Sequence, residues 1–274
     1  MYYRKTLSNG IRVIGEKINH FRSVSIGVWI GAGSCWETAE INGISHFLEH
    51  MFFKGTYNRK ASEIAGAIDS IGGQINAFTA KECTCLYAKV MDEHIKIAVD
   101  VLSDMLLNSK FDPEEIKKEI GVVSEEILMS EDSPEDVAHD LLAKAYFDTH
   151  PLGMTILGTK ESLATFERKT LLDYIERLYV PSNIVIAVAG GFDEAALGDM
   201  LEETFGKMPA RKGDIPCECK EVHENKKCVL KHEKDIEQLN ICVGFPGIAQ
   251  SSDDITTLLV FNNLFGGSMS SRLF

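Results

Sequence analysis

The sequence has 274 residues, of which 45% are hydrophobic and 25% are charged. A chain of this length and composition can bury one large core or two modest ones. The formal charge of −13, from 41 acidic against 28 basic residues, argues against a nucleic-acid partner because phosphate binding needs a basic face. The longest apolar runs are far shorter than the roughly 20 residues of a membrane helix, and the first residues lack the apolar core of a signal peptide. We therefore expect a cytoplasmic protein without a membrane contact.

The first two hundred residues predict an α+β domain with a mixed, mainly antiparallel sheet flanked by helices. Strands are predicted at 11–16, 23–30, 74–79, 84–90 and 184–189, with the first two paired as a hairpin. Helices are predicted from Gly43, over 61–71, 93–107 and 112–129, from Ser133 on to about Tyr179, and over 193–205. This order of elements is that of a complete domain.

A second copy of the same order of elements begins after a short linker. Strands at 228–232 and 239–245 precede an apolar helix at 255–265, as two strands precede the helix that starts at Gly43. When the FFKGT segment at 52–56 is laid on LFGGS at 264–268, His46, Glu49 and His50 fall on Leu258, Phe261 and Asn262. We interpret the chain as a duplicated module: 1–212 is the first copy, 213–220 a linker, and 221–274 the start of a truncated second copy that lacks these three side chains.

His46, Glu49 and His50 form an H-x-x-E-H pattern on the first predicted helix. Side chains four residues apart lie on one face of a helix, so both imidazoles can bind one ion while Glu49 stays beside them. Catalytic zinc takes three protein ligands and one water, and a nearby carboxylate can accept the proton of that water. Because about 0.03 such patterns are expected by chance in this composition, the pattern needs a third ligand to indicate a site.

Three glutamates on the helix predicted from Asp112 are candidates for that ligand. Glu119 and Glu126 are seven residues apart and share a face, whereas Glu125 points about 100° away from Glu126. A Glu119/Glu126 face toward the metal and a solvated acidic face are both compatible with this spacing.

Five segments make the chain similar to the pitrilysin/insulinase family of inverted zinc peptidases, and within it to bacterial proteins of the mitochondrial-processing-peptidase type. They are GISHFLEHMFFKGT, GGQINAFTAKECTCLYAKV, SEEILMSEDSPED, HPLG and GGSMSSRLF, and H-x-x-E-H is the signature of such enzymes. The resemblance implies one zinc ion per chain, with His46, His50 and Glu126 as ligands and Glu49 as the general base. It also implies that Glu119 orients a ligand from behind.

The resemblance further implies a processing-peptidase-like fold of two similar halves around a chamber. Asn76, Ala77 and Phe78 would lie on an edge strand near the metal, where a substrate peptide can add as another strand; a core strand after a Gly-Gly turn is the alternative for this segment. An Arg and a Tyr that contact substrate in the family's second half would lie beyond Phe274. The other half is therefore expected from the same longer chain or from a partner chain, with a homodimer as one form of assembly.

Two functions from different classes fit these residues. The first is a zinc-dependent endopeptidase that hydrolyses peptides or presequence-like segments through a zinc-activated water. The alternative is a catalytically silent peptide-binding or scaffold subunit of the same architecture. A silent subunit is expected to have lost at least one of His46, Glu49, His50 and Glu126, and all four are present. We therefore favour the endopeptidase, with 1–212 as its zinc-binding catalytic module and 221–274 as the start of the metal-free, truncated second module.

Overall fold

The computed structural model describes residues 2–213 and 228–274. The chain separates into two compact units, Met1–Asn240 and Ile241–Phe274. The linker predicted at 213–220 lies outside the described residues except for Gly213, and the domain boundaries at 212 and 221 stay predictions. Within the described ranges, no helix combines the length and the apolar character needed to cross a membrane.

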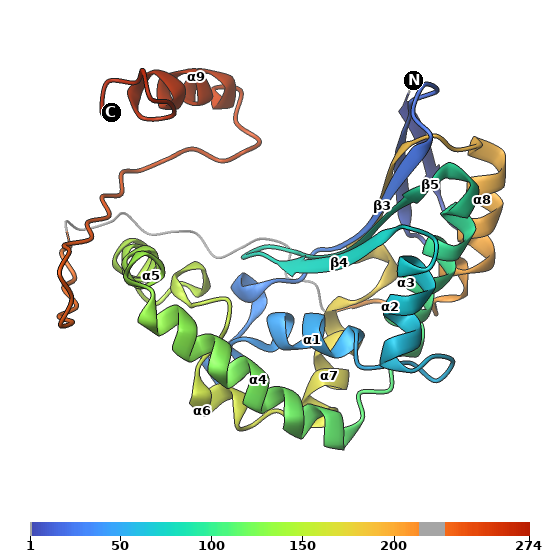
Figure 1. The fold of residues 1–274 in the computed structure, drawn as a ribbon, viewed down its shortest axis with the longest axis horizontal. Helices are drawn as coiled ribbons and strands as arrows, with labels where there is room; N and C mark the ends of the chain where they lie inside the picture. Colours follow the sequence, from blue (N-terminus) through green and yellow to red (C-terminus); the bar gives the residue numbers. More distant parts are fainter. Residues whose placement is uncertain (1, 214–227) are drawn as a thin grey trace. The chain divides into compact units, whose positions relative to one another are not determined.

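The first unit contains a six-stranded sheet of mixed direction (Figure 1). Its strands are β1 (Tyr2–Thr6), β2 (Arg12–Lys17), β3 (Ser23–Ile30), β4 (Gln74–Thr79), β5 (Thr84–Met91) and β6 (Ile184–Gly190). They lie in the order β1-β2-β6-β3-β5-β4, and only the β2–β6 pair is parallel. The predicted fold class, a mixed and mainly antiparallel sheet in an α+β domain, is confirmed, and β4 is an edge strand.

The hairpin predicted between 11–16 and 23–30 is wrong. Strand β6 lies between β2 and β3, pairing with β2 in parallel and with β3 antiparallel. Its inward residues Ile184, Ile186 and Val188 are at most 3% exposed, and a central position between two strands buries them best. The hairpin partner of β2 is β1, which the sequence did not predict.

The helices of the first unit gather on one side of this sheet. They are α1 (Ile44–Phe52), α2 (Ala61–Asp69), α3 (Ile95–Asn108), α4 (Pro113–Asp132), α5 (Pro134–Phe147), α6 (Lys160–Leu163), α7 (Arg168–Leu178) and α8 (Glu194–Glu203). Helix α4 begins as its sequence predicts, because the Asp112 side chain accepts a hydrogen bond from the Glu114 amide and Pro113 occupies the first turn. Helices α1, α2 and α3 contact strands β3, β4 and β5, and α1 lies between β4 and α4 (Figure 1).

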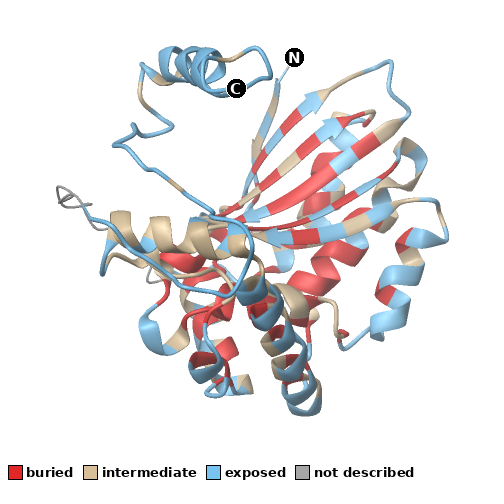
Figure 2. Cartoon of the chain, turned by 60° about the vertical axis from the view of Figure 1, so that its left-hand side comes forward, coloured by how far each residue is buried: buried red, intermediate tan, exposed pale blue. Residues whose placement is uncertain are grey.

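Burial alternates along the strands, as Figure 2 shows by the succession of buried and exposed residues. In β3 the residues Val24, Ile26, Val28 and Ile30 are at most 1% exposed and face the helices. The residues of β3 that alternate with these four point to the other face of the sheet. On that face, Trp29 lies in a cluster with aromatic residues of β4 and β5. The apolar core is therefore formed between the sheet and helices α1 and α3.

The second unit contains one helix, α9 (Ile255–Phe265), within its described residues. This helix is the predicted one. When α1 is shifted by the repeat offset of 212 it spans 256–264, and α9 contains that span. The strands predicted at 228–232 and 239–245 are wrong, since these residues form no ladder. A strand needs a neighbour to satisfy its backbone groups, and Leu239 and Phe245 are exposed without one among the described residues.

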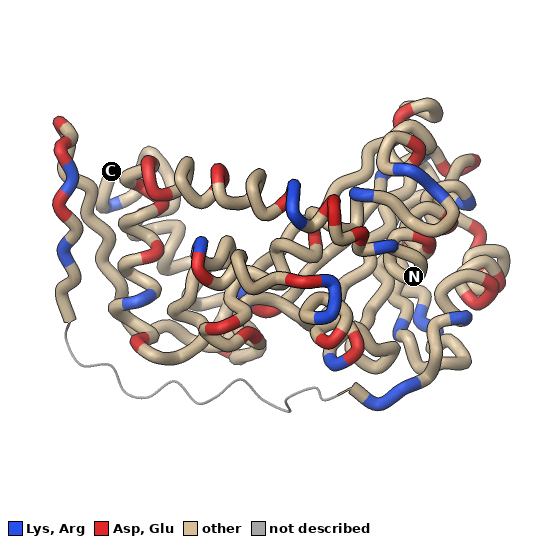
Figure 3. Tube along the Cα trace, turned by 90° about the horizontal axis from the view of Figure 1, so that it is seen from below, with Lys and Arg blue, Asp and Glu red and all other residues tan. Residues whose placement is uncertain are grey.

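Acidic residues are spread along α4 and α5 (Figure 3). Helix α4 carries seven acidic and two basic residues, and α5 carries three acidic and one basic. Both basic residues of α4, Lys117 and Lys118, pair with glutamates on their own helix. The two helices therefore present a net negative charge beside α1.

Candidate functional site

Helix α1 presents the H-x-x-E-H side chains on a rigid element. Its apolar residues Ile44, Phe47, Leu48 and Met51 are at most 1% exposed, and this face fixes the helix in the core. Gly43 precedes the helix with φ 92°, and a Cβ there would lie 2.5 Å from the Leu157 carbonyl oxygen. Only glycine fits that position, so the start of the helix is fixed by backbone contact with a distant loop.

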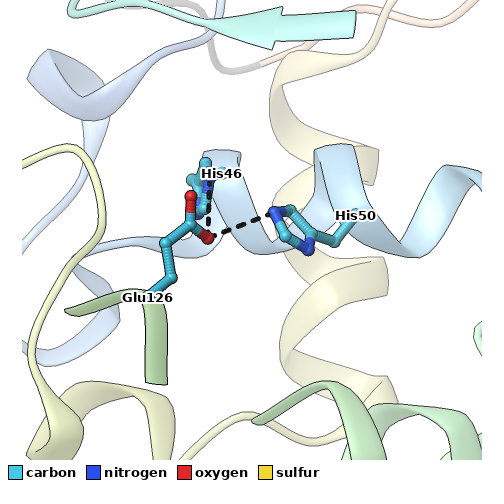
Figure 4. A group of neighbouring side chains, drawn as sticks. All are labelled: His46, His50 and Glu126. Carbon is cyan, nitrogen blue, oxygen red and sulfur yellow. Dashed lines mark ion pairs between the residues drawn. The ribbon is translucent and has the colours of Figure 1, made fainter. Parts of the chain in front are cut away.

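His46 and His50 of α1 and Glu126 of α4 converge on one point (Figure 4). Glu126 Oε2 lies 3.7 Å from His46 Nε2 and 3.5 Å from His50 Nε2, and one ligand atom of each residue lies within 4.8 Å of the others. Two ligand atoms at about 2.0–2.1 Å from a tetrahedral zinc ion are about 3.4 Å apart. Two nitrogens and a carboxylate oxygen at this spacing fit the predicted metal, and no other such group of three occurs in 2–213 or 228–274.

The protonation state of His46 suits metal binding. Burial, and then the neighbouring His50, lowers the pKa of His46 to about 4, so its ring is neutral at neutral pH and keeps a lone pair for an ion. His46 Nδ1 is buried and has no hydrogen-bond partner in the described part of the chain. Packing rather than a second hydrogen bond therefore sets the orientation of this ring.

Glu119 holds the second histidine from behind. It is 3% exposed and lies 2.8 Å from His50 Nδ1 and 2.6 Å from Lys54 Nζ. Burial alone would raise the pKa of Glu119, but the bonds from His50 and Lys54 bring it below its usual range. A carboxylate on the far nitrogen of a histidine orients the ring toward a metal. The structure places Glu119 against the far nitrogen of His50, and its role behind a metal ligand stays a prediction.

Lys54 is a functional neighbour that the sequence did not predict. It follows His50 by four residues and lies two residues beyond the end of α1. Its ammonium group neutralises the buried Glu119 carboxylate. Its four-residue spacing from His50 was the signal in the sequence that could have indicated this contact.

Glu49 lies beside the three converging side chains and outside their group. Its Oε2 accepts a hydrogen bond of 2.7 Å from Thr79 Oγ1. Burial raises the pKa of Glu49, and the bond from Thr79 opposes that rise. The charges of His50 and Glu126 also act on the pKa of Glu49, His50 lowering it and Glu126 raising it. This position suits a general base.

The predicted substrate strand is the edge strand β4. Asn76 and Phe78 are exposed and Ala77 is 8% exposed. The Ala77 amide donates to Asn76 Oδ1 at 2.9 Å and so does not bond to β5. The edge-strand part of the prediction is confirmed, while binding of a substrate by these residues stays a prediction.

A buried carboxylate that the sequence did not predict holds the start of α1. Glu37 is 3% exposed and accepts bonds from the Gly43 amide (2.7 Å), the Ser45 amide (2.9 Å) and Asn42 Nδ2 (2.9 Å). Burial raises the pKa of Glu37, and these bonds oppose the rise. Helix α1 has no cap from its own N-cap residue, so Glu37 satisfies its first amides and complements its dipole. Nothing in the sequence distinguishes this acid from a solvated one.

Replacing Glu37 by Gln is expected to lower the melting temperature by roughly 2–10 °C. The amide group of Gln would face backbone donors and leave about 1–3 kcal/mol of buried hydrogen bonding unsatisfied. Differential scanning calorimetry would measure the change. The matched control is Glu40→Gln in the same loop, which is exposed and should shift the melting temperature little. Equal melting temperatures for the two variants would contradict the role given to Glu37.

The first and second parts of the chain match two family models. Residues 12–160 match the model "Insulinase (Peptidase family M16)", and residues 165–274 match "Peptidase M16 inactive domain". Among curated relatives, the chain is 52% identical over 274 residues to the "Uncharacterized zinc protease YmxG" of Bacillus subtilis, covering 100% of this chain and 66% of that protein. It is 34% identical to the "Mitochondrial-processing peptidase subunit beta" of Lentinula edodes, covering 95% of this chain and 57% of that protein.

Solved structures share the fold. A protease from Helicobacter pylori matches with a TM-score of 0.73 at 22% identity, over 81% of this chain and 53% of that one. A peptidase M16 inactive domain from Pseudomonas fluorescens matches with a TM-score of 0.85 at 15% identity, over 100% of this chain and 66% of that one. At these identities the likeness concerns the fold alone. The insulinase-family model covers more than half of the sequence, and the chain therefore belongs to the insulinase family of peptidases, peptidase family M16.

Proposed function

We propose that this chain is the zinc-binding part of a zinc-dependent endopeptidase. The observation that carries the proposal is the convergence of His46, His50 and Glu126 within 4.8 Å, with the Glu49 carboxylate beside them and outside their group. A zinc ion held by these three residues would act as a Lewis acid and lower the pKa of a coordinated water toward about 7. Curated relatives that the chain resembles at 37–52% identity carry the name zinc protease.

The residues of the chain divide the remaining work between them. Glu49 would accept the proton of the attacking water and deliver it to the leaving amine of the cleaved peptide bond. Glu119 and Lys54 would keep His50 in its binding orientation. Strand β4 would bind the substrate in extended form, because its free edge offers backbone donors and acceptors next to Glu49.

We further propose that basic, presequence-like peptides are preferred substrates. The support is the acidic surface of α4 and α5, which carry eight acidic residues besides Glu119 and Glu126 and only three basic ones (Figure 3). An acidic wall concentrates a cationic peptide near the site and speeds its association. A relative of the chain carries the name mitochondrial-processing peptidase subunit beta. The rest of the chamber would come from a second homologous half, in the same longer chain or in a partner, since this chain spans 57–66% of the length of the relatives named above.

The test uses the full-length protein. Elemental analysis should find about one zinc ion per chain, and an unstructured basic peptide should be cleaved. A chelator should stop cleavage and added zinc should restore it. An acidic peptide of equal length is the control and should be cleaved more slowly at low salt. A protein that neither contains nor takes up zinc, or one that cleaves equally well after chelation, would overturn the proposal.

A further inference from the structure

Thr79 joins the edge strand to the carboxylate beside the metal-binding group. It is the last residue of β4, one position beyond the segment predicted to bind substrate. Its hydroxyl donates to Glu49 Oε2 at 2.7 Å and lies 3.5 Å from the Ser45 carbonyl oxygen. Within the described residues, Thr79 is the only residue that donates a hydrogen bond to the Glu49 side chain. The orientation of this half-buried carboxylate therefore depends on one hydroxyl group.

The backbone of the same residue faces the open edge of the sheet. Beyond the end of β4, the Ala80 amide donates to the Cys83 carbonyl at 2.8 Å, so Ala80 and Cys83 form a hydrogen-bonded pair. Such pairs alternate along an antiparallel ladder, which directs the backbone of Phe78 toward β5 and the backbones of Ala77 and Thr79 away from it. The Ala77 amide, which bonds to Asn76 Oδ1 instead of to β5, agrees with this alternation.

We propose that Thr79 is a positioning residue that couples the binding of a peptide strand to the orientation of Glu49. A peptide added to β4 would bond to the Thr79 backbone, while the Thr79 side chain holds the carboxylate that acts on its scissile bond. A glutamate has several rotamers, and fixing one of them within a fraction of an ångström is worth a large factor in rate. The inference rests on the proposed endopeptidase function and adds to it a residue outside the metal-binding motif.

The test compares three variants of the full-length protein on a peptide substrate. Thr79→Val keeps the shape and the strand preference of threonine but removes the hydroxyl, and Thr79→Ser keeps the hydroxyl. Thr79→Val should lower kcat by roughly 10–100-fold, with KM and zinc content within about twofold of the parent protein because the backbone edge and the metal group are unchanged. Thr79→Ser should recover most of kcat.

The matched control is Thr84→Val on the neighbouring strand. Thr84 lies opposite Thr79 in register and is fully buried, and its hydroxyl donates to the Ala32 carbonyl rather than to Glu49. This variant loses a buried hydroxyl of the same kind, so it should change the melting temperature and leave kcat near that of the parent. If Thr79→Val unfolds, Thr79→Ala removes the same hydroxyl without adding a methyl group, and it should show the same loss of kcat.

Three results would overturn the role of Thr79. They are an unchanged kcat in Thr79→Val, a loss of zinc from that variant in proportion to its loss of kcat, or a kcat in Thr79→Ser as low as in Thr79→Val. Each is distinct from a failure of the proposed function, in which the parent protein itself would lack zinc or hydrolysis. If the parent protein cleaves peptide, Glu49→Gln is inactive and Thr79→Val is fully active, the endopeptidase function stands. The coupling through Thr79 is then wrong.

Discussion

Replacing Glu49 by Gln is expected to lower kcat for peptide hydrolysis by about 10³-fold or more while zinc stays bound. Gln has the size of Glu and its carbonyl oxygen can still accept the bond from Thr79 Oγ1, so the local packing is kept. The amide does not accept a proton at neutral pH, and a positioned base contributes roughly 10²–10⁴-fold to such reactions. The metal-binding group does not include Glu49, so its affinity for zinc should change little.

Steady-state kinetics with elemental analysis of the same preparation would measure both effects. The control is Glu63→Gln, an exposed glutamate near the start of α2 that faces no part of the metal-binding group, and it should retain the parent kcat. Undiminished turnover in Glu49→Gln with zinc in place would show that the base lies elsewhere. A loss of zinc together with activity would instead place Glu49 among the ligands.

The fold could be predicted from the sequence where its signals are local. The alternation of β3 and the Asp112-Pro113 start of α4 depend on neighbouring residues, and both elements form as predicted. The place of β6 depends on pairing with strands more than 150 residues earlier in the chain. Nothing near Ile184 encodes that partner, whereas the short link after 11–16 favoured a hairpin. Strand order was therefore the part that local patterns could not give.

The candidate site divides in the same way. Helical spacing alone predicted that Glu126 shares a face with Glu119 and that Glu125 points away. In the structure, Glu126 lies at the two histidines and Glu125 is exposed. Glu37 and Thr79 act on α1 from other elements: Glu37 accepts bonds from the Gly43 and Ser45 amides, and Thr79 donates one bond to Glu49. A sequence does not reveal which acid becomes buried or which hydroxyl faces it, because both depend on tertiary contacts.

Replacing Glu126 by Ala is expected to weaken zinc binding by more than the roughly 100-fold that loss of an outer partner produces. The variant removes one of three protein ligands and leaves only the two imidazoles on α1. Alanine is the best helix former, and the Glu126 side chain is 43% exposed, so α4 itself should remain intact. Competition with a chelator of known affinity would measure the dissociation constant.

The neighbouring residue provides the control for this prediction. Glu125→Ala changes the same charge on the same helix, one residue away, but Glu125 is exposed and outside the metal-binding group. It should bind zinc like the parent protein, and equal affinities for the two variants would remove Glu126 from the site. Zinc held by all three ligands links α1 to α4 across 76 residues of chain and stabilises the folded state in proportion to its saturation. The rise in melting temperature on adding zinc should therefore persist in Glu125→Ala and largely disappear in Glu126→Ala, because two ligands on one helix no longer join the two elements.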